Sequence, residues 1–231
     1  MKNESIKNKY RVEPIPKEHT YDWLLNKHYA KRIPGIISYC FGLYDKTKTL
    51  QGVCVFGLGN RVMNDGDSVF NKELKIRTLE LQRLVINEGM EKGVLSFFVS
   101  KCLMQLPKPM CIYSYADSNV GHHGYIYQAT NWIYTGMSTP RTTFLDTRTG
   151  EYIHERTLSG VYGTSSTSRL PKYIEIGKEE GGKYRYFFFL GDKKQIEEMK
   201  MYFSYKILPY PKGENNRYDA SYKPTTMKSL F

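Results

Sequence analysis

The sequence predicts a layered domain of the α/β or α+β class, in which helices pack on a mixed β-sheet. Short runs of apolar, β-branched and aromatic residues alternate with stretches of helical periodicity, and turns that contain Gly or Pro separate them. One strongly helical stretch joins two of the apolar runs, which favours parallel pairing of those two strands. The length of 231 residues suits one large domain.

The N-terminal sequence MKNESIKNKY is simply polar, and the first clear element is a helix. Thr20 is a candidate N-cap, apolar residues recur at helical spacing up to Tyr29, and the helix is expected to end before Pro34. Residues 36–45 and 50–59 are β-rich and are separated by the polar sequence DKTKT. This pattern predicts an antiparallel hairpin.

The middle of the chain continues the sheet. The expected elements are a strand at 78–86, a helix at 94–106, a buried strand at 110–117 and a strand at 132–140. The glycine-bearing turn NEGMEKG leads into the helix, and Pro107 and Pro109 follow it. A loop that passes into a short helix precedes the last strand.

The remainder, from about Arg141, differs in composition. The expected elements are a hairpin at 143–153, an excursion rich in Ser, Thr, Gly, Arg and Lys at 154–177, a strand at 183–191 and an amphipathic helix at 193–203. We expect residues 1–140 to form a catalytic core and 141–213 to continue it with a basic insertion that contacts DNA. Residues 214–231 form a tail, all within one structural domain.

Charge and composition indicate which kind of molecule the protein binds. Lys and Arg total 34 against 23 Asp and Glu, a formal net charge of +11, and a polyanionic partner such as nucleic acid is a common physical reason for such a balance. No apolar run approaches the roughly 18 residues that span a membrane, and no signal-peptide pattern opens the chain. The 20 Tyr and 11 Phe could stack on flat partners or simply serve strands and core.

The four cysteines indicate a reducing compartment. They lack CxxC spacing and lie in apolar surroundings, so buried free thiols in the cytoplasm are expected.

Asp117 marks the first candidate site. It ends a buried strand, at the sheet edge where ligands bind in proteins with crossover helices, and a Gly- and His-rich loop follows. His122 and His123 could act as bases or ligands, although adjacent histidines diverge on regular elements. Asp117 could equally be a helix cap.

A second candidate site lies where the strand at 78–86 turns into a helix. The free N–H groups of that helix start, with Gly93 and Ser96 nearby, can hold a diphosphate or another anion, but the glycine spacing matches no phosphate-binding motif. Arg83 lies on an otherwise apolar strand and therefore requires an anionic partner. That partner could be Glu80, in a purely structural pair.

Two further patterns have both functional and structural interpretations. His28 and Tyr29 close the first helix, where a His is often a satisfied structural residue. On the strand at 183–191, Lys183 and Arg185 alternate with Tyr184 and Tyr186, which places cations on one face and aromatics on the other. Such a strand suits phosphates and flipped bases, or any exposed edge strand.

Several motifs resemble the Mom family of bacteriophage adenine-modification proteins, from about His28 to Gly213. They are Glu-Leu-x-Arg-Leu-Val at 80–85, SYAD at 114–117, GxxGxIYQATNxIYTG at 121–136, and KYRYFFFLGDKKQ at 183–195 with PYPKG at 209–213.

The resemblance implies a GNAT-like acyltransferase fold with a mostly antiparallel central sheet, in which two strands splay apart to admit coenzyme A. It implies conversion of adenine in double-stranded DNA to N6-methylcarbamoyladenine, which shields phage DNA from restriction in the cytoplasm of the infected host. The donor would be acetyl-CoA or a related acyl donor, and an iron ion is a further expectation. The turn NEGMEKG departs from the usual GNAT diphosphate signature Arg/Gln-x-x-Gly-x-Gly/Ala.

The resemblance places the family's functional positions on His28, Tyr29, Arg83, Ser96, Asp117 and Tyr127. Together with the residue patterns above, they predict individual roles. Catalytic roles fall on Asp117, Tyr127, His28 and Tyr29. Donor-binding roles fall on Arg83, Ser96, Gly93 and Val85. DNA contacts are expected from Lys183, Arg185, Tyr184, Tyr186, Arg169 and Lys172, and possible iron ligands are His28, Tyr29 and Asp117.

Two alternative functions stay open. One is a conventional acetyl-CoA-dependent GNAT N-acetyltransferase that acts on a protein or small-molecule amine. The other is a non-catalytic DNA-binding module, which the charge of +11 permits.

Overall fold

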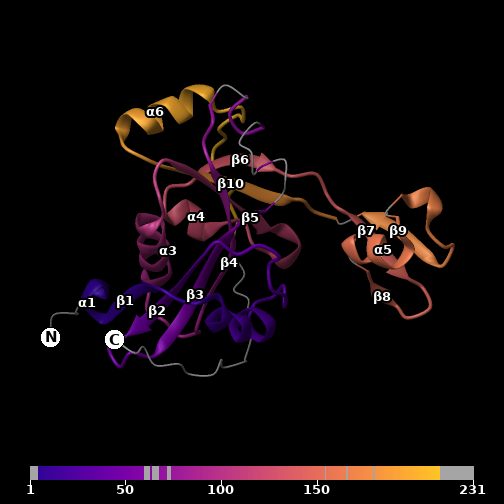
Figure 1. Ribbon diagram of the computed structural model, residues 1–231, viewed down its shortest axis with the longest axis horizontal. Helices are drawn as coiled ribbons and strands as arrows, with labels where there is room; N and C mark the ends of the chain where they lie inside the picture. Colours follow the sequence, from indigo (N-terminus) through magenta and orange to yellow (C-terminus); the bar gives the residue numbers. More distant parts are fainter. Residues whose placement is uncertain are drawn as a thin grey trace.

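The computed structural model describes residues 5–59, 63, 68–71, 74–153, 155–164, 166–178 and 180–213, and a seven-stranded sheet forms its centre (Figure 1). In spatial order the strands are β1 (Tyr10–Pro14), β2 (Tyr39–Asp45), β3 (Leu50–Gly57), β4 (Thr78–Ile86), β5 (Met110–Asp117), β10 (Lys183–Leu190) and β6 (Ile133–Met137). The longer helices are α3 (Val94–Gln105), α5 (Glu155–Tyr162) and α6 (Lys193–Tyr202). The shorter helices are α1 (Ile6–Lys9), η1 (Lys17–Thr20), the π-helix η2 (Trp23–Lys27), η3 (Ser118–Val120), α4 (Tyr125–Ala129) and η4 (Thr167–Arg169).

The predicted α/β class with a mixed, mostly antiparallel sheet flanked by helices is confirmed. Strands β2 and β3 form the predicted antiparallel hairpin. Strands β4 and β5 pair in parallel, and α3 is the crossover helix between them. A helix is needed here because parallel neighbours must be joined across the length of the sheet.

Strands β4 and β5 pair only at their beginnings and then separate. The paired residues run from Thr78 with Cys111 to Glu80 with Tyr113, although β4 continues to Ile86 and β5 to Asp117. On its other side β4 stays paired with β3, with an irregularity that sets Val55 opposite Arg83 and Phe56 opposite Leu81. Such a bulge bends its strand. The splayed pair expected of a GNAT-like fold is therefore present.

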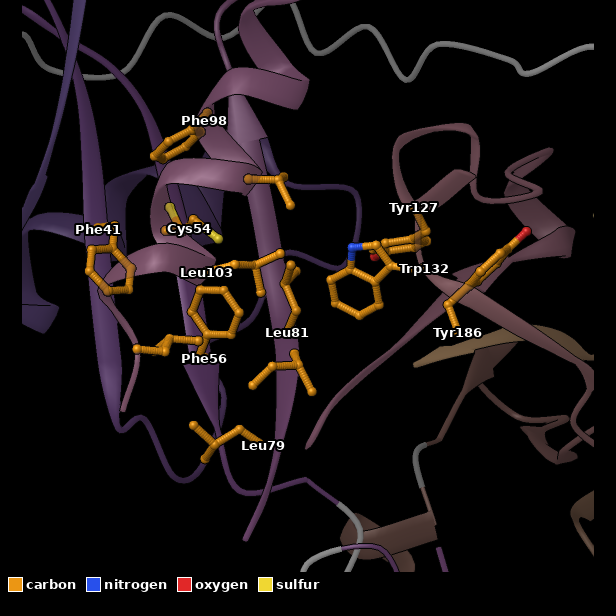
Figure 2. Close-up of a cluster of buried hydrophobic side chains, with 14 of the residues drawn as sticks. Phe41, Cys54, Phe56, Leu79, Leu81, Phe98, Leu103, Tyr127, Trp132 and Tyr186 are labelled. Carbon is orange, nitrogen blue, oxygen red and sulfur yellow. The ribbon is translucent and has the colours of Figure 1, made fainter. Parts of the chain in front are cut away.

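The main core lies between the sheet and α3. Figure 2 shows side chains of this core, including Phe56 and Leu81 from the sheet and Phe98 and Leu103 from α3, all of them buried. Full burial of one such side chain stabilises the fold by about 1.5–3 kcal/mol. The core continues to Trp132, so α3 and the β5–β10–β6 side of the sheet share one cluster.

The predicted first helix and the N-terminal sequence before it both differ from expectation. The helical segment ends at Lys27, and His28 is already extended at φ −74° and ψ 138°. The buried Lys27 ammonium pairs with Glu88 at 2.6 Å, which ties this last turn to the segment after β4. Before this segment, the polar N-terminal sequence, for which no element was expected, forms α1 and the edge strand β1. An edge strand that is half exposed carries no continuous apolar run, so its sequence signal is weak.

Residues 142–178 form a separate small sheet, which we call the lobe. Its strands, in the order β8 (Glu151–Tyr152), β7 (Thr142–Asp146) and β9 (Ile174–Lys178), have their own core of Phe144, Leu158 and Ile174. The predicted hairpin at 143–153 is β7 and β8. The lobe stands apart from the main sheet and is joined to it between β6 and β10 (Figure 1).

All four cysteines are buried free thiols, as predicted. No helix in the described part of the chain is long and apolar enough to cross a bilayer. The tail at 214–231 lies outside the described residues.

Candidate functional site

An aromatic and imidazole cluster lies beside the splayed strands. The rings of His28 and Tyr29 stack with centroids 4.4 Å apart, and Tyr29 meets His122 edge to face at 5.7 Å. Burial lowers the pKa of His28 to about 3, and the charges of Arg83 and His122 act in the same direction. His28 is therefore a neutral imidazole at physiological pH. The loop after η2 and the loop after β5, which are far apart in sequence, meet here.

Asp117 ends β5 beside this cluster. One carboxylate oxygen accepts from the N–H of Asn119 at 3.1 Å, which makes Asp117 the N-cap of η3. The other accepts from the Lys183 ammonium at 2.5 Å. Burial raises the pKa of Tyr29, and the charge of Asp117 raises it further. The capping interpretation is thus correct, and it leaves Asp117 next to Tyr29.

Tyr127 connects α4 to the point at which β4 and β5 separate. Its hydroxyl lies 2.7 Å from that of Ser114, and Ser114 donates its own proton to the carbonyl oxygen of Leu81 at 2.8 Å. Because Ser114 has one proton to give, Tyr127 is the donor in the first bond. Complete burial raises the pKa of Tyr127 well above its usual value, so the phenol stays protonated. Ser114 was not singled out from the sequence, although the motif SYAD contains it.

Arg83 occupies the splayed half of β4 as a half-buried cation. One terminal nitrogen donates to the carbonyl oxygen of Gln82 at 2.6 Å, while the buried Nε has no hydrogen-bond partner. The pKa of Arg83 is lowered by burial and by the charge of Arg32. Among the described residues no hydrogen bond or ion pair is found between Arg83 and Glu80, but their charges interact: burial raises the pKa of Glu80 and the charge of Arg83 opposes this rise, while the charge of Glu80 opposes the lowering of the pKa of Arg83.

The start of α3 borders a cavity. Gly93 is the N-cap of α3, with φ +95° and no side-chain cap hydrogen bond, and Ser96 donates to its carbonyl oxygen at 3.0 Å. Both residues line this cavity, which has a volume of about 430 Å³, is wide open to solvent and lies between α1, α3 and α4. Val85 does not face this cavity, because its side chain is buried in the cluster that contains Trp23 and Val53. Its expected role in donor binding can involve only its backbone.

Comparison with known proteins identifies the family of this chain. Residues 9–212 match the Mom protein family. The chain belongs to this family. It is also 26% identical over 211 residues to the methylcarbamoylase Mom of Escherichia phage Mu, covering 87% of this chain and 83% of that protein. The resemblance inferred from the motifs is confirmed.

Solved structures with partial similarity to this Mom-family chain are N-acetyltransferases. The spermidine/spermine N-acetyltransferase SpeG of Vibrio cholerae aligns over 85% of this chain and 99% of its own, with a TM-score of 0.43 and 12% identity. The GNAT family N-acetyltransferase YhbS of Escherichia coli, solved with CoA, aligns over 54% of this chain and 68% of its own, with a TM-score of 0.37 and 14% identity.

The expected DNA contacts on β10 need correction in this Mom-family protein. Strand β10 is paired on both sides, with β5 and with β6, and is not an edge strand. Tyr186 is fully buried and donates to the carbonyl oxygen of His123 at 2.5 Å, so it cannot stack on a base. Lys183 is paired with Asp117, and Arg185 packs over the ring of Tyr205 at 4.1 Å.

The other expected contacts are more accessible. Tyr184 is half-buried beside Tyr134, with ring centroids 6.1 Å apart. Arg169 and Lys172 are exposed on the lobe. Of the expected DNA contacts, the exposed cations are therefore on the lobe and not on β10.

The side chains do not fit an iron site as they are placed. His28 accepts the N–H of Ala30 on Nδ1 at 3.0 Å, which leaves the proton on Nε2 and no free lone pair for a metal. Both oxygens of Asp117 are engaged by Asn119 and Lys183. Within the described residues, no three His, Cys, Asp or Glu side chains converge as a metal site would need.

Proposed function

We propose that this protein is a phage DNA-modification enzyme that converts adenine in double-stranded DNA to N6-methylcarbamoyladenine and thereby protects phage DNA from host restriction. The observation that carries the proposal is the convergence of Asp117, Tyr29, His28 and Arg83 beside splayed strands, in a member of the Mom family. The phage Mu relative is named a methylcarbamoylase, which supports the same chemistry here.

The charge of the protein supports DNA as the substrate. The net charge of +11 favours binding to a polyanion, and Arg169 and Lys172 provide exposed cations on the lobe. An adenine inside a duplex is stacked and paired, so the enzyme must first extrude it from the helix. The lobe would hold the backbone while the extruded base reaches the main sheet.

The chemistry begins from a poor nucleophile, because the lone pair of the adenine amine is delocalised into the ring. A bond forms between N6 and the carbon of the donor as the bond from that carbon to its leaving group breaks, and the leaving group keeps the electron pair. The Asp117 carboxylate accepts the proton lost from N6. Tyr127 would stabilise the charge that develops as the bonds change by turning its hydroxyl proton from Ser114 to the substrate.

An acyl-CoA donor fits the splayed strands. The unpartnered Nε of Arg83 lies in the splayed half of β4, and Gly93 and Ser96 line the cavity at the start of α3. A bound acyl-CoA would supply an activated carbonyl carbon. A methylcarbamoyl group contains a nitrogen atom that an acetyl group lacks. The step balances with a related donor whose methylcarbamoyl carbon is bonded to the sulfur of coenzyme A, so that the thiolate of coenzyme A leaves as N6 attacks.

One experiment separates this proposal from its alternatives. The protein is expressed in bacteria, and the nucleosides of plasmid DNA are examined by mass spectrometry for methylcarbamoylated adenine. We expect the wild-type protein to produce it and Asp117→Asn to produce none. The matched control Asp192→Asn alters a carboxylate that caps α6, where Asn is also a good cap, and should stay active.

The alternatives give different results in the same cells. A conventional acetyltransferase would leave adenine unmodified and acetylate an amine without DNA. A DNA-binding module would leave adenine unmodified in every variant. Unchanged modification in a folded Asp117→Asn protein would remove Asp117 from the chemistry.

A further inference from the structure

We propose that Lys183 is a positioning residue that fixes the carboxylate of Asp117 and does not contact DNA phosphate. This inference rests on the proposed function, because it assigns Lys183 a part in the same reaction. The positioning role replaces the DNA contact that the alternating basic and aromatic residues of β10 had indicated for Lys183.

The first support is the geometry of the ion pair. Lys183 and Asp117 stand directly opposite each other where β10 pairs with β5, and the Lys183 ammonium meets the Asp117 carboxylate at 2.5 Å. The side chains are only 20% and 11% exposed. A pair shielded from water in this way is screened little by salt. The carboxylate therefore has one defined orientation.

The second support is that the backbone on both sides of the pair is held by hydrogen bonds. Ser118 donates to the carbonyl oxygen of Gly182 at 2.5 Å, and the Asn119 side chain accepts from the N–H of Gly181 at 3.2 Å. These bonds join the segment that follows Asp117 to the segment that precedes Lys183.

A further pair of bonds fixes Lys183 from the side of β6. The N–H of Lys183 donates to the hydroxyl of Ser138 at 3.0 Å, and the N–H of Ser138 donates to the carbonyl oxygen of Lys183 at 2.8 Å. Gly182 permits this close approach, since a Cβ there would collide with the carbonyl oxygen of Ser138. The lobe leaves and rejoins the main sheet at these residues, so the pair sits at the base of the lobe.

The third support is the cost of any alternative partner for Lys183. A DNA phosphate would have to compete with Asp117 for a mostly buried ammonium. If the phosphate won, Asp117 would remain a poorly solvated carboxylate without its cation, which is unfavourable. Exposed cations on the lobe, such as Arg169 and Lys172, reach a phosphate without that penalty.

The test uses Lys183→Met, Lys183→Arg and the lobe variant Arg169→Ala/Lys172→Ala in the full chain. Modified adenine in plasmid DNA is quantified by mass spectrometry, and binding of the purified proteins to a duplex is measured by fluorescence anisotropy at several salt concentrations. We expect Lys183→Met to lose at least about 10-fold in modification with an unchanged salt slope of DNA binding. Lys183→Arg should restore most of the modification, because it keeps the charge.

The outcomes separate the inference from the proposed function. No modified adenine with the wild-type protein would reject the proposed function itself. Wild-type activity together with full activity of Lys183→Met would overturn only the positioning role. A salt slope reduced by about 1 in Lys183→Met would show a phosphate contact and also overturn it. If Lys183→Met melts early, Lys183→Gln, which is also uncharged, takes its place with the same readouts.

Discussion

The hydroxyl of Ser114 donates to the carbonyl oxygen of Leu81 at 2.8 Å, one residue beyond the last paired residues of β4 and β5. The same hydroxyl accepts the proton of Tyr127, so three elements meet at the point where the sheet opens. The opening is thus closed at its base by side-chain hydrogen bonds, and Tyr127 is held in one orientation.

Ser114→Ala should destabilise the protein by about 1–3 kcal/mol, because it leaves the buried hydroxyl of Tyr127 and the carbonyl of Leu81 without a partner. Urea unfolding followed by circular dichroism measures the change. Tyr127→Phe removes the other hydroxyl, and the double variant should cost less than the sum of the two single variants. Strict additivity would show that the two hydroxyls are not coupled.

Arg83→Met should leave the unliganded protein as stable as the wild type or more stable, because it removes a half-buried cation whose Nε has no partner. Under the proposed function coenzyme A should raise the melting temperature of the wild-type protein, and the same variant should lose that rise. Differential scanning fluorimetry with and without coenzyme A measures both effects. Arg77→Met, an exposed arginine just before β4, is the control and should keep the rise.

His28 should make stability depend on pH below neutrality. Its folded pKa is about 3, whereas its ordinary value is 6.5, so between these values the unfolded chain binds a proton that the folded protein does not. The stabilisation is complete above pH 6.5 and is lost as the pH falls toward 3, by up to about 1.4 kcal/mol per pH unit.

The measurement compares urea unfolding of the wild type and His28→Asn from pH 4.5 to 8. Asn can still accept the N–H of Ala30, as Nδ1 of His28 does. The free-energy difference between the two proteins should shift in favour of the wild type as the pH rises to about 6.5. A difference that is constant with pH would contradict a neutral, buried His28.

Arg169→Ala/Lys172→Ala should weaken duplex binding and reduce its salt slope by about 2, since two phosphate contacts are lost at about 0.9 each. Fluorescence anisotropy at salt concentrations from about 50 mM to about 300 mM measures the slope. Lys46→Ala/Lys200→Ala removes the same charge from exposed positions outside the lobe and is the matched control. Equal slopes for both double variants would mean that the lobe makes no special contact.

Gly124→Ala should destabilise the protein by about 2–4 kcal/mol, because φ is +85° and a Cβ would collide with the ring of the buried Tyr186. Thermal and urea unfolding measure the loss. Gly160→Ala in α5, where a Cβ meets open space, is the control and should be neutral or slightly stabilising. Comparable losses in both variants would contradict the close packing of Gly124 on Tyr186.

The sequence by itself determined the elements whose signal is local. The hairpin β2–β3, the crossover helix α3 and the strand that ends at Asp117 follow from apolar periodicity, turn residues and proline positions, each read within a dozen residues. The motifs also determined the family. Position at the end of β5 was enough to make Asp117 a candidate site residue, because strand ends in such sheets face ligands.

Only the tertiary structure decided which strands are neighbours. Strand β10 lies between β5 and β6, so its aromatic face turns into the core at Tyr186 and its first cation meets Asp117. Alternation along one strand specifies two faces but does not say what covers them, since the neighbouring strands are distant in sequence. Tyr184 lies opposite Met137, and Lys183 lies opposite Asp117. The splay of β4 from β5 and the edge strand β1 depend on such distant pairing in the same way.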